Sequence, residues 1–154
     1  MQYSKLIDAY LAGPDLLEKA VGALSESQLD AVPIPGKWST RQVICHIADF
    51  ELVYADRMKR VVAVSEPTLF GGDPDVYAAR LNYEQRNVQE ELQLVKAIRV
   101  HMARILRSLT ENDFQRIGHH SEDGPLTLET LLQRITEHIP HHIRFIKEKR
   151  ELLG

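Results

Sequence analysis

Three histidines, His46, His138 and His142, combine a side chain that can bind a transition metal with positions that point inward. His138 and His142 are four residues apart, so in a helix they lie one turn above each other and can aim at one point. They share the face of the apolar residues of that stretch, Leu128, Leu131, Leu132, Ile135, Ile139 and Ile146. His46 lies between Val43 and Phe50 at helical spacing, which turns it toward the interior of another helix.

Three neutral imidazoles leave one or more positions of a tetrahedral or octahedral divalent ion open, as in a catalytic rather than a closed structural site. Such an ion can lower the pKa of water to supply hydroxide, or hold a thiol as thiolate. Each inward histidine could instead be a hydrogen-bonded core residue, and spacing alone leaves that alternative open. Two buried imidazoles on a leucine and isoleucine face would nevertheless need polar partners.

Several neighbours are weaker candidates for chemistry. Asp49 follows His46 by about one turn and could orient an imidazole or act as a catalytic base, with a loop-binding or solvated acid as the alternative. His101 shares a row with apolar residues and could approach the pocket. His120 falls in a polar connection, where it is either solvated or carried over the mouth of the bundle. His141 lies on a charged stripe and is predicted to face solvent.

Other residues are assigned structural roles. Cys45 points about 100° away from its neighbour His46 on a helix, which disfavours a shared metal and favours a small buried hydrophobe. Trp38 is the only tryptophan and is predicted to seal a loop against the helices rather than to stack on a substrate. Glu51 and the basic cluster are predicted to lie on the surface, the cluster being Arg57, Lys59 and Arg60.

Four helical stretches must position these residues. Apolar periodicity and capping residues predict helices over about 2–24, from Ser39 or Thr40 to about 64, from the turn at 70–74 to about 109, and over 127–152. The first helix is expected to be bent or interrupted at Gly13-Pro14, and Pro140 is expected to adjust the angle between His138 and His142. The polar segment 112–125 is predicted to be a long connection with a short hairpin or a single turn.

The composition limits the class of protein. The 154 residues fit a single helical domain spanning 1–154, and four helices with short and medium loops predict an all-α four-helix bundle. A net charge of -3 offers no basic surface for nucleic acid. No apolar run predicts a membrane span and the start of the chain does not resemble a signal peptide, so the cytoplasm is the expected compartment; the single cysteine fits a reducing environment.

Two segments resemble the DinB/YfiT-like family. The first, PGKWSTRQVICHIAD at 35–49, is similar to the family's entry into the second helix. The second comprises HSEDG at 120–124, Thr127-Leu128 and HIPHH at 138–142, and is similar in order and separation to the last-helix signature. The resemblance extends from Leu16 to Ile146.

The resemblance implies a four-helix bundle in which one divalent metal, nickel or zinc, is held by His46, His138 and His142. It also implies a homodimer and a small-molecule substrate, because relatives include metal-dependent hydrolases and transferases that use a low-molecular-weight thiol such as bacillithiol or mycothiol. A thiol S-transferase or hydrolase is therefore the leading hypothesis. A non-catalytic metal-binding stress-response protein, or a bundle whose core histidines bind no metal, are the alternatives.

Overall fold

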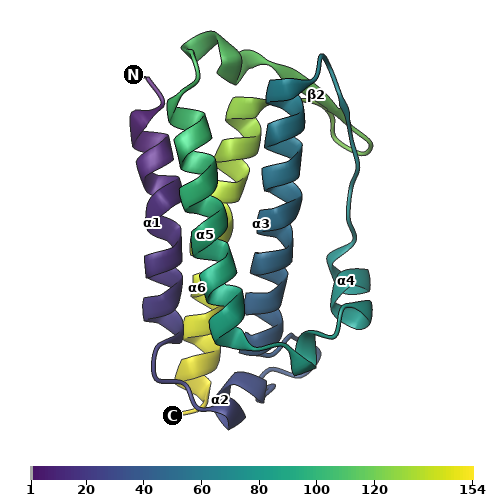
Figure 1. The fold of residues 1–154 in the computed structure, drawn as a ribbon. Coiled ribbons are helices and arrows are strands. Elements are labelled where there is room, and N and C mark those ends of the chain that lie inside the picture. The colour runs from purple at the N-terminus through teal and green to yellow at the C-terminus, as the bar shows by residue number, and fades with distance from the viewer. Residues whose placement is uncertain (1) are drawn as a thin grey trace.

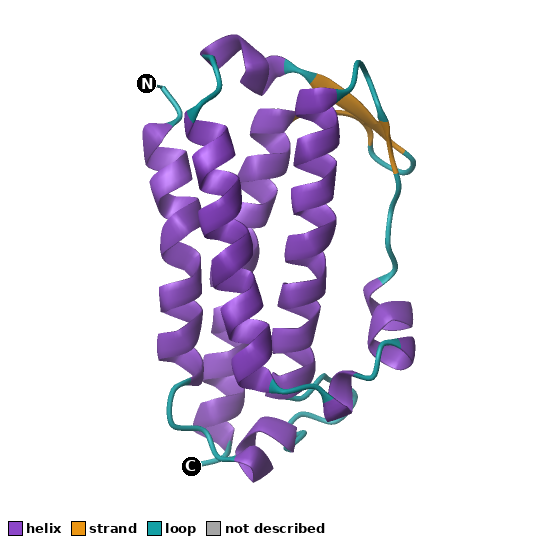
Figure 2. Cartoon of the chain, in the orientation of Figure 1, coloured by secondary structure: helices purple, strands orange, loops and turns teal. Residues whose placement is uncertain are grey.

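The computed structural model describes residues 2–154, most of which lie in four long helices packed side by side (Figures 1 and 2). These helices are α1 (Ser4–Val21), α3 (Thr40–Ala63), α5 (Val88–Arg107) and α6 (Leu128–Leu152). Helices α1 and α3 lie diagonally, and each packs against both α5 and α6. Helices α1 and α6 run in one direction along the bundle, and α3 and α5 run in the other (Figure 1). The predicted all-α four-helix bundle is confirmed.

The two helices that carry the inward histidines begin where the sequence predicts. The Ser39 side chain accepts a hydrogen bond from the backbone of Gln42, whose own side chain accepts from Ser39, so a reciprocal cap fixes the start of α3. The Thr127 hydroxyl accepts from the Thr130 backbone and caps α6 without a reciprocal bond to the Thr127 backbone. Helix α6 continues without a break through Pro140.

The first helix is expected to be bent or interrupted at Gly13-Pro14, and the interruption is absent, since α1 is continuous from Ser4 to Val21. A proline inside a helix leaves the carbonyl four residues earlier without its backbone donor. Here that carbonyl belongs to Tyr10, and the Arg99 Nη1 atom donates to it at 2.7 Å. A side chain from α5 thus replaces the hydrogen bond that Pro14 removes.

The prediction of one long third helix is also wrong. The segment instead forms α4 (Pro74–Arg80), a 3-10 turn η1 (Tyr83–Gln85) and then α5. Asn82 adopts the left-handed conformation, with φ of 57°, which ends the first piece, and the Asn87 side chain caps α5 by accepting from the Glu90 backbone. Helix α4 consequently lies beside α3, within the long connection between the parallel helices α3 and α5 (Figure 1).

The connection before α6 contains the predicted hairpin. After η2 (Glu111–Gln115), strand β2 (Ile117–His120) pairs antiparallel with β3 (Gly124–Thr127). A two-residue strand β1 (Thr68–Leu69), which the sequence analysis did not predict, pairs parallel with β2. The small sheet lies at the end of the bundle where α3 ends and α6 begins (Figure 2).

The centre of the bundle holds a buried ion pair between Arg99 of α5 and Glu51 of α3, both of which are fully buried. The prediction that Glu51 is a surface residue is therefore wrong. Arg99 also donates to the carbonyls of Tyr10 in α1 and Ile135 in α6. One guanidinium group thus connects all four long helices. Arg57 is likewise buried rather than solvated, because it donates to the Phe70 carbonyl.

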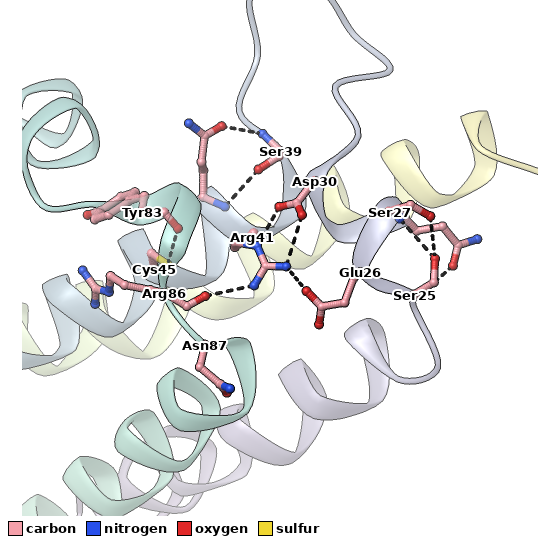
Figure 3. Close-up of polar contacts among 12 residues, drawn as sticks. Ser25, Glu26, Ser27, Asp30, Ser39, Arg41, Cys45, Tyr83, Arg86 and Asn87 are labelled. Atoms are coloured by element: carbon pink, nitrogen blue, oxygen red, sulfur yellow. Dashed lines mark hydrogen bonds and ion pairs between the residues drawn. The ribbon is translucent and has the colours of Figure 1, made fainter.

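Arg41 connects the start of α3 to two other segments (Figure 3). Its guanidinium forms ion pairs with Glu26 and Asp30, which belong to the short helix α2 (Glu26–Asp30). The same group donates to the Arg86 carbonyl at 2.9 Å, immediately before α5. These contacts fix the first turns of α3, which carry His46. Within residues 2–154, every helix is too short or too polar to span a membrane.

Candidate metal centre

The structure brings the three inward histidines together, with His46 on α3 and His138 and His142 on α6. The Nε2 atom of His46 lies 2.9 Å from that of His138 and 3.1 Å from that of His142, and the latter two atoms are 3.1 Å apart. Three ring nitrogens from two helices thus form a nearly equilateral triangle. Such separations match the spacing of ligand atoms around one ion at about 2.0 to 2.1 Å.

All three imidazoles are neutral at physiological pH. Burial lowers the pKa of His46 to about 4, although the nearby charge of Asp49 opposes the shift. Burial and then the other histidines lower the pKa of His138 to about 2, and the same causes lower that of His142 to about 3. A neutral ring offers a nitrogen lone pair, which is the form that binds a metal.

The unpaired ring atoms test whether a metal fits. The Nδ1 atoms of His46 and His138 are buried and, among the residues described, have no hydrogen-bond partner. If each Nδ1 carries the proton, the three Nε2 lone pairs point at one another, an arrangement that a cation stabilises. In either tautomer the buried Nδ1 atoms lack a partner, so the close approach of the three Nε2 atoms is the feature that a cation would account for. The donor set therefore fits a divalent ion that prefers imidazole, such as zinc or nickel.

Aromatic side chains hold the His46 ring in place. The Trp38 ring centroid lies 5.1 Å from that of His46, and the Phe50 centroid lies 4.8 Å away. Trp38 therefore packs against the helices as predicted, and it does so on a histidine of the cluster. Phe145, which the sequence analysis did not single out, contacts His141 and His142 from the next turn of α6. Its helical spacing from His142 could have identified it.

Asp49 is buried beside the cluster, but its carboxylate belongs to another network. Both of its oxygens accept from Arg86, at 2.7 and 3.1 Å, and Arg86 also pairs with Glu91. Of the hydrogen bonds within residues 2–154, none joins Asp49 to an imidazole, and its charge acts on His46 only through space. Its predicted role as an orienting group or base stays a prediction.

The remaining histidines lie outside the cluster. His101 and His141 are exposed, so the prediction that His141 faces solvent is confirmed and His101 does not approach the site. His120 is buried in β2, where its Nδ1 accepts from the backbones of Glu122 and Asp123 and stabilises the hairpin turn. Cys45 is buried, as predicted, with its thiol directed at the Tyr83 carbonyl (Figure 3).

Two cavities border the cluster and could admit a small molecule. One, of about 480 Å³, is bounded by Trp38, His142 and Phe145 among others. The other is a wider groove of about 1040 Å³ that includes Tyr54 and His138. Different histidines of the cluster therefore face different cavities.

Comparison with known proteins gives consistent matches along nearly the whole chain. A family model described as "DinB superfamily" matches residues 9–146. A Bacillus subtilis protein named "Putative metal-dependent hydrolase YfiT" is 28% identical over 154 residues, covering 99% of this chain and 86% of the relative. A protein of Geobacillus thermodenitrificans named "Putative metal-dependent hydrolase" is 29% identical over 142 residues. The match covers 92% of this chain and 80% of that relative.

A solved structure matches the fold as well. It is described as "YfiT from Bacillus subtilis is a probable metal-dependent hydrolase with an unusual four-helix bundle topology". It superposes with a TM-score of 0.92 at 28% identity, covering 99% of this chain and 88% of the solved one.

Proposed function

The chain belongs to the DinB superfamily, and from that membership we propose that it is a metal-dependent enzyme that acts on a small molecule. His46, His138 and His142 would hold one divalent transition metal, nickel or zinc. The observation that carries the proposal is the triangle of Nε2 atoms, with sides of 2.9 to 3.1 Å, contributed by two helices. The names of its relatives, which refer to metal-dependent hydrolases, support the same assignment.

The surrounding residues prepare the three nitrogens for this role. Burial keeps the rings neutral, and packing by Trp38 and Phe50 fixes the orientation of His46. When bound, a divalent ion supplies an electrophilic centre that lowers the pKa of a water molecule or a thiol and polarises a carbonyl group.

Hydrolysis is the reaction that the relatives' names support most directly. Transfer of a low-molecular-weight thiol to an electrophile is a second reaction that the same residues would support, because a divalent ion held by them would activate either water or a thiol as the nucleophile. The two differ in the group that enters: water in hydrolysis, sulfur in thiol transfer. Asp49 is the proposed orienting group or base in either reaction, acting from its place beside His46.

A non-catalytic role is the second candidate, and one observation favours it. The cluster joins α3 to α6, two helices separated by 92 residues at the His46 and His138 positions. A metal bound there would link α3 to α6 and stabilise the fold without catalysing a reaction.

Metal binding is tested on protein purified without a histidine tag, stripped with a chelator and reloaded with nickel or zinc. Elemental analysis should give one ion per chain, and His46→Ala, His138→Ala and His142→Ala should each weaken binding at least about 100-fold. The control is His101→Ala, which removes an exposed histidine outside the cluster and should leave binding unchanged. Equal metal binding by the His138 and His101 variants would contradict the site.

Turnover distinguishes the reactions. The metal-loaded and metal-free proteins are incubated with esters, amides and electrophiles, each with and without a low-molecular-weight thiol. Metal-dependent product without thiol supports hydrolysis, and conjugate formed with one equivalent of thiol supports transfer. Equal rates for loaded and stripped protein across the panel would exclude the enzyme and favour the structural role, provided that metal still binds.

A further inference from the structure

Lys149 of α6 is a buried cation without a counter-ion. The residue exposes only 4% of its surface. Within residues 2–154, no carboxylate oxygen lies within 4.0 Å of its ammonium nitrogen, and its side chain makes no hydrogen bond to another residue. Of the other buried cations in the described residues, Arg41 and Arg99 each form an ion pair, and Arg57 donates to the Phe70 carbonyl. A charge with so little contact with solvent and no counter-ion is costly, so its presence needs an explanation.

Lys149 borders the cavity of about 480 Å³ that also contacts His142. The two residues are seven positions apart, which places them two turns apart on the same face of α6, on the order of 10 Å along the helix axis. Apolar side chains form much of the wall between them, namely Ile34, Trp38, Val43 and Phe145. The cavity therefore has a cation at one end, a histidine of the cluster at the other and an apolar wall.

The other charged residues at the cavity do not neutralise Lys149. Lys37 adds a second positive charge, whereas Asp75 and Glu148 are acidic and exposed to solvent. Burial and Lys37 lower the pKa of Lys149, and Glu148 opposes the shift without forming an ion pair. Exposed charges are screened by water and stabilise a buried cation weakly. The buried end of the cavity is thus left with an unmatched positive charge.

We propose that this cavity binds the carboxylate or phosphate group of an elongated organic anion, with the Lys149 ammonium as its counter-ion. The apolar wall contacts the body of the ligand. A second step rests on the proposed function: the reacting group of the same molecule lies at the histidine cluster. The substrate, or a thiol co-substrate, therefore carries its negative charge on the order of 10 Å from the group that reacts.

Trp38 provides the readout, because it is the only tryptophan and forms part of the cavity wall. Metal-free protein is titrated with four ligands of equal chain length, hexanoate, hexyl phosphate, hexanamide and hexylamine, while the tryptophan fluorescence is recorded. At least one of the two anions should bind about tenfold or more tightly than hexanamide. Whether hexanoate or hexyl phosphate binds more tightly identifies the anionic group. Equal affinity for hexanamide and both anions would overturn the proposal.

Variants assign the preference to Lys149. Lys149→Met should remove the preference for anions, and Lys149→Arg should retain most of it. Lys147→Met is the matched control, because Lys147 is exposed on the same helix and does not border this cavity. Lys149→Met should also raise the melting temperature, since it removes an unpaired buried charge. An unchanged anion preference in Lys149→Met would overturn the assignment, and if that variant does not fold, loss of the preference in Lys149→Gln takes its place.

The titration uses metal-free protein, so its outcome is independent of the proposed function. Anion binding that depends on Lys149, in a protein that fails to bind nickel or zinc, would retain the anion site and remove the enzyme. Metal binding at the histidines without any preference for anions would retain the proposed enzyme and overturn the anion site.

Discussion

At the scale of single residues, the neutral state of the clustered imidazoles makes the free energy of unfolding depend on pH. The pKa of His46 is lowered from its ordinary value of 6.5 to about 4 in the folded protein, mainly by burial. In the unfolded chain the same ring is solvated and takes up a proton near pH 6.5. Below that pH the unfolded state therefore binds more protons than the folded state, and acid favours unfolding.

The free energy of unfolding of the metal-free protein should be highest above pH 6.5 and should fall as the pH is lowered toward 4. Urea unfolding at pH 7, 6 and 5 measures this slope. His46→Gln should make the slope shallower, whereas His101→Gln, at an exposed histidine of α5 outside the cluster, should leave it unchanged. A slope that is the same in both variants and in the wild type would mean that other groups cause the acid sensitivity.

The sequence identifies the clustered histidines because each shares a helical face with apolar residues, which is a local signal. The environments of Glu51 and Arg57 could not be found in this way, since a charged residue in a helix is predicted to face solvent. The partner of Glu51 is Arg99, 48 residues away on another helix. Only the packing of the helices brings these two charges together, and no spacing rule encodes it.

At the scale of elements, Arg99 determines how the four helices meet. It pairs with Glu51 of α3 and donates to the carbonyls of Tyr10 in α1 and Ile135 in α6. Its guanidinium also lies 4.5 Å from the centre of the Tyr10 ring. Removal of either partner of a buried pair leaves an uncompensated charge, which costs far more than the loss of an exposed pair.

Glu51→Gln should lower the free energy of unfolding by about 3 to 5 kcal/mol, since it leaves Arg99 buried without a counter-ion. Chemical denaturation measures the loss. Asp56→Asn, which breaks the exposed pair with Arg60 on the same helix, should cost at most about 0.5 kcal/mol. The double variant Glu51→Leu with Arg99→Met should recover part of the loss. Similar effects of the Glu51 and Asp56 variants would contradict this role for the buried pair.

Gly13 allows Arg99 to approach α1. A Cβ atom at Gly13 would clash with the Arg99 Nη1 atom, which cannot move away without breaking its bond to the Tyr10 carbonyl. Gly13→Ala should therefore destabilise the protein by about 1 to 3 kcal/mol, although alanine is normally the better helix former. Combined with Arg99→Met, the same substitution should cost much less. Equal costs in the two backgrounds, measured by denaturation, would exclude the steric contact.

The boundaries of α3 and α6 could be predicted because Ser39 and Thr127 carry capping signals next to the helices they begin. The third helix could not, because its interruption depends on the left-handed conformation of Asn82, a residue that helices also tolerate. The continuity of α1 through Pro14 depends on a donor from α5. The local sequence identifies Pro14 as a helix breaker. It does not reveal the Arg99 side chain of α5, which supplies the missing hydrogen bond.

At the scale of the whole molecule, the histidine cluster connects α3 with α6, which Arg99 also links through Glu51 and the Ile135 carbonyl. An ion held there binds the folded state and not the unfolded one. It should therefore stabilise the entire bundle by mass action.

Loading with nickel or zinc at about 100 times the dissociation constant should raise the melting temperature by roughly 5 to 10 °C. Differential scanning calorimetry with and without a chelator measures the difference. The His142→Ala variant should show no such increase. An equal rise in that variant would mean that the ion stabilises the protein from another place.

The bundle as a whole could be predicted from four apolar periodicities and from the family resemblance. The parallel arrangement of α3 and α5 could not be predicted. The apolar periodicity of a helix does not indicate in which direction that helix runs after a long connection. Residues 64–87 run back along the bundle, with β1 pairing on the later hairpin and α4 beside α3. A single domain, a homodimer and a cytoplasmic location stay predictions.

The central claim is that one ion binds between the three Nε2 atoms, and the most direct test is a crystal structure of protein loaded with nickel or zinc. Data collected on both sides of the metal absorption edge locate the ion. We predict one anomalous peak at about 2.0 to 2.1 Å from the Nε2 atoms of His46, His138 and His142. Fully loaded crystals in which the peak lies elsewhere, or in which the three rings diverge with no density between them, would contradict the claim.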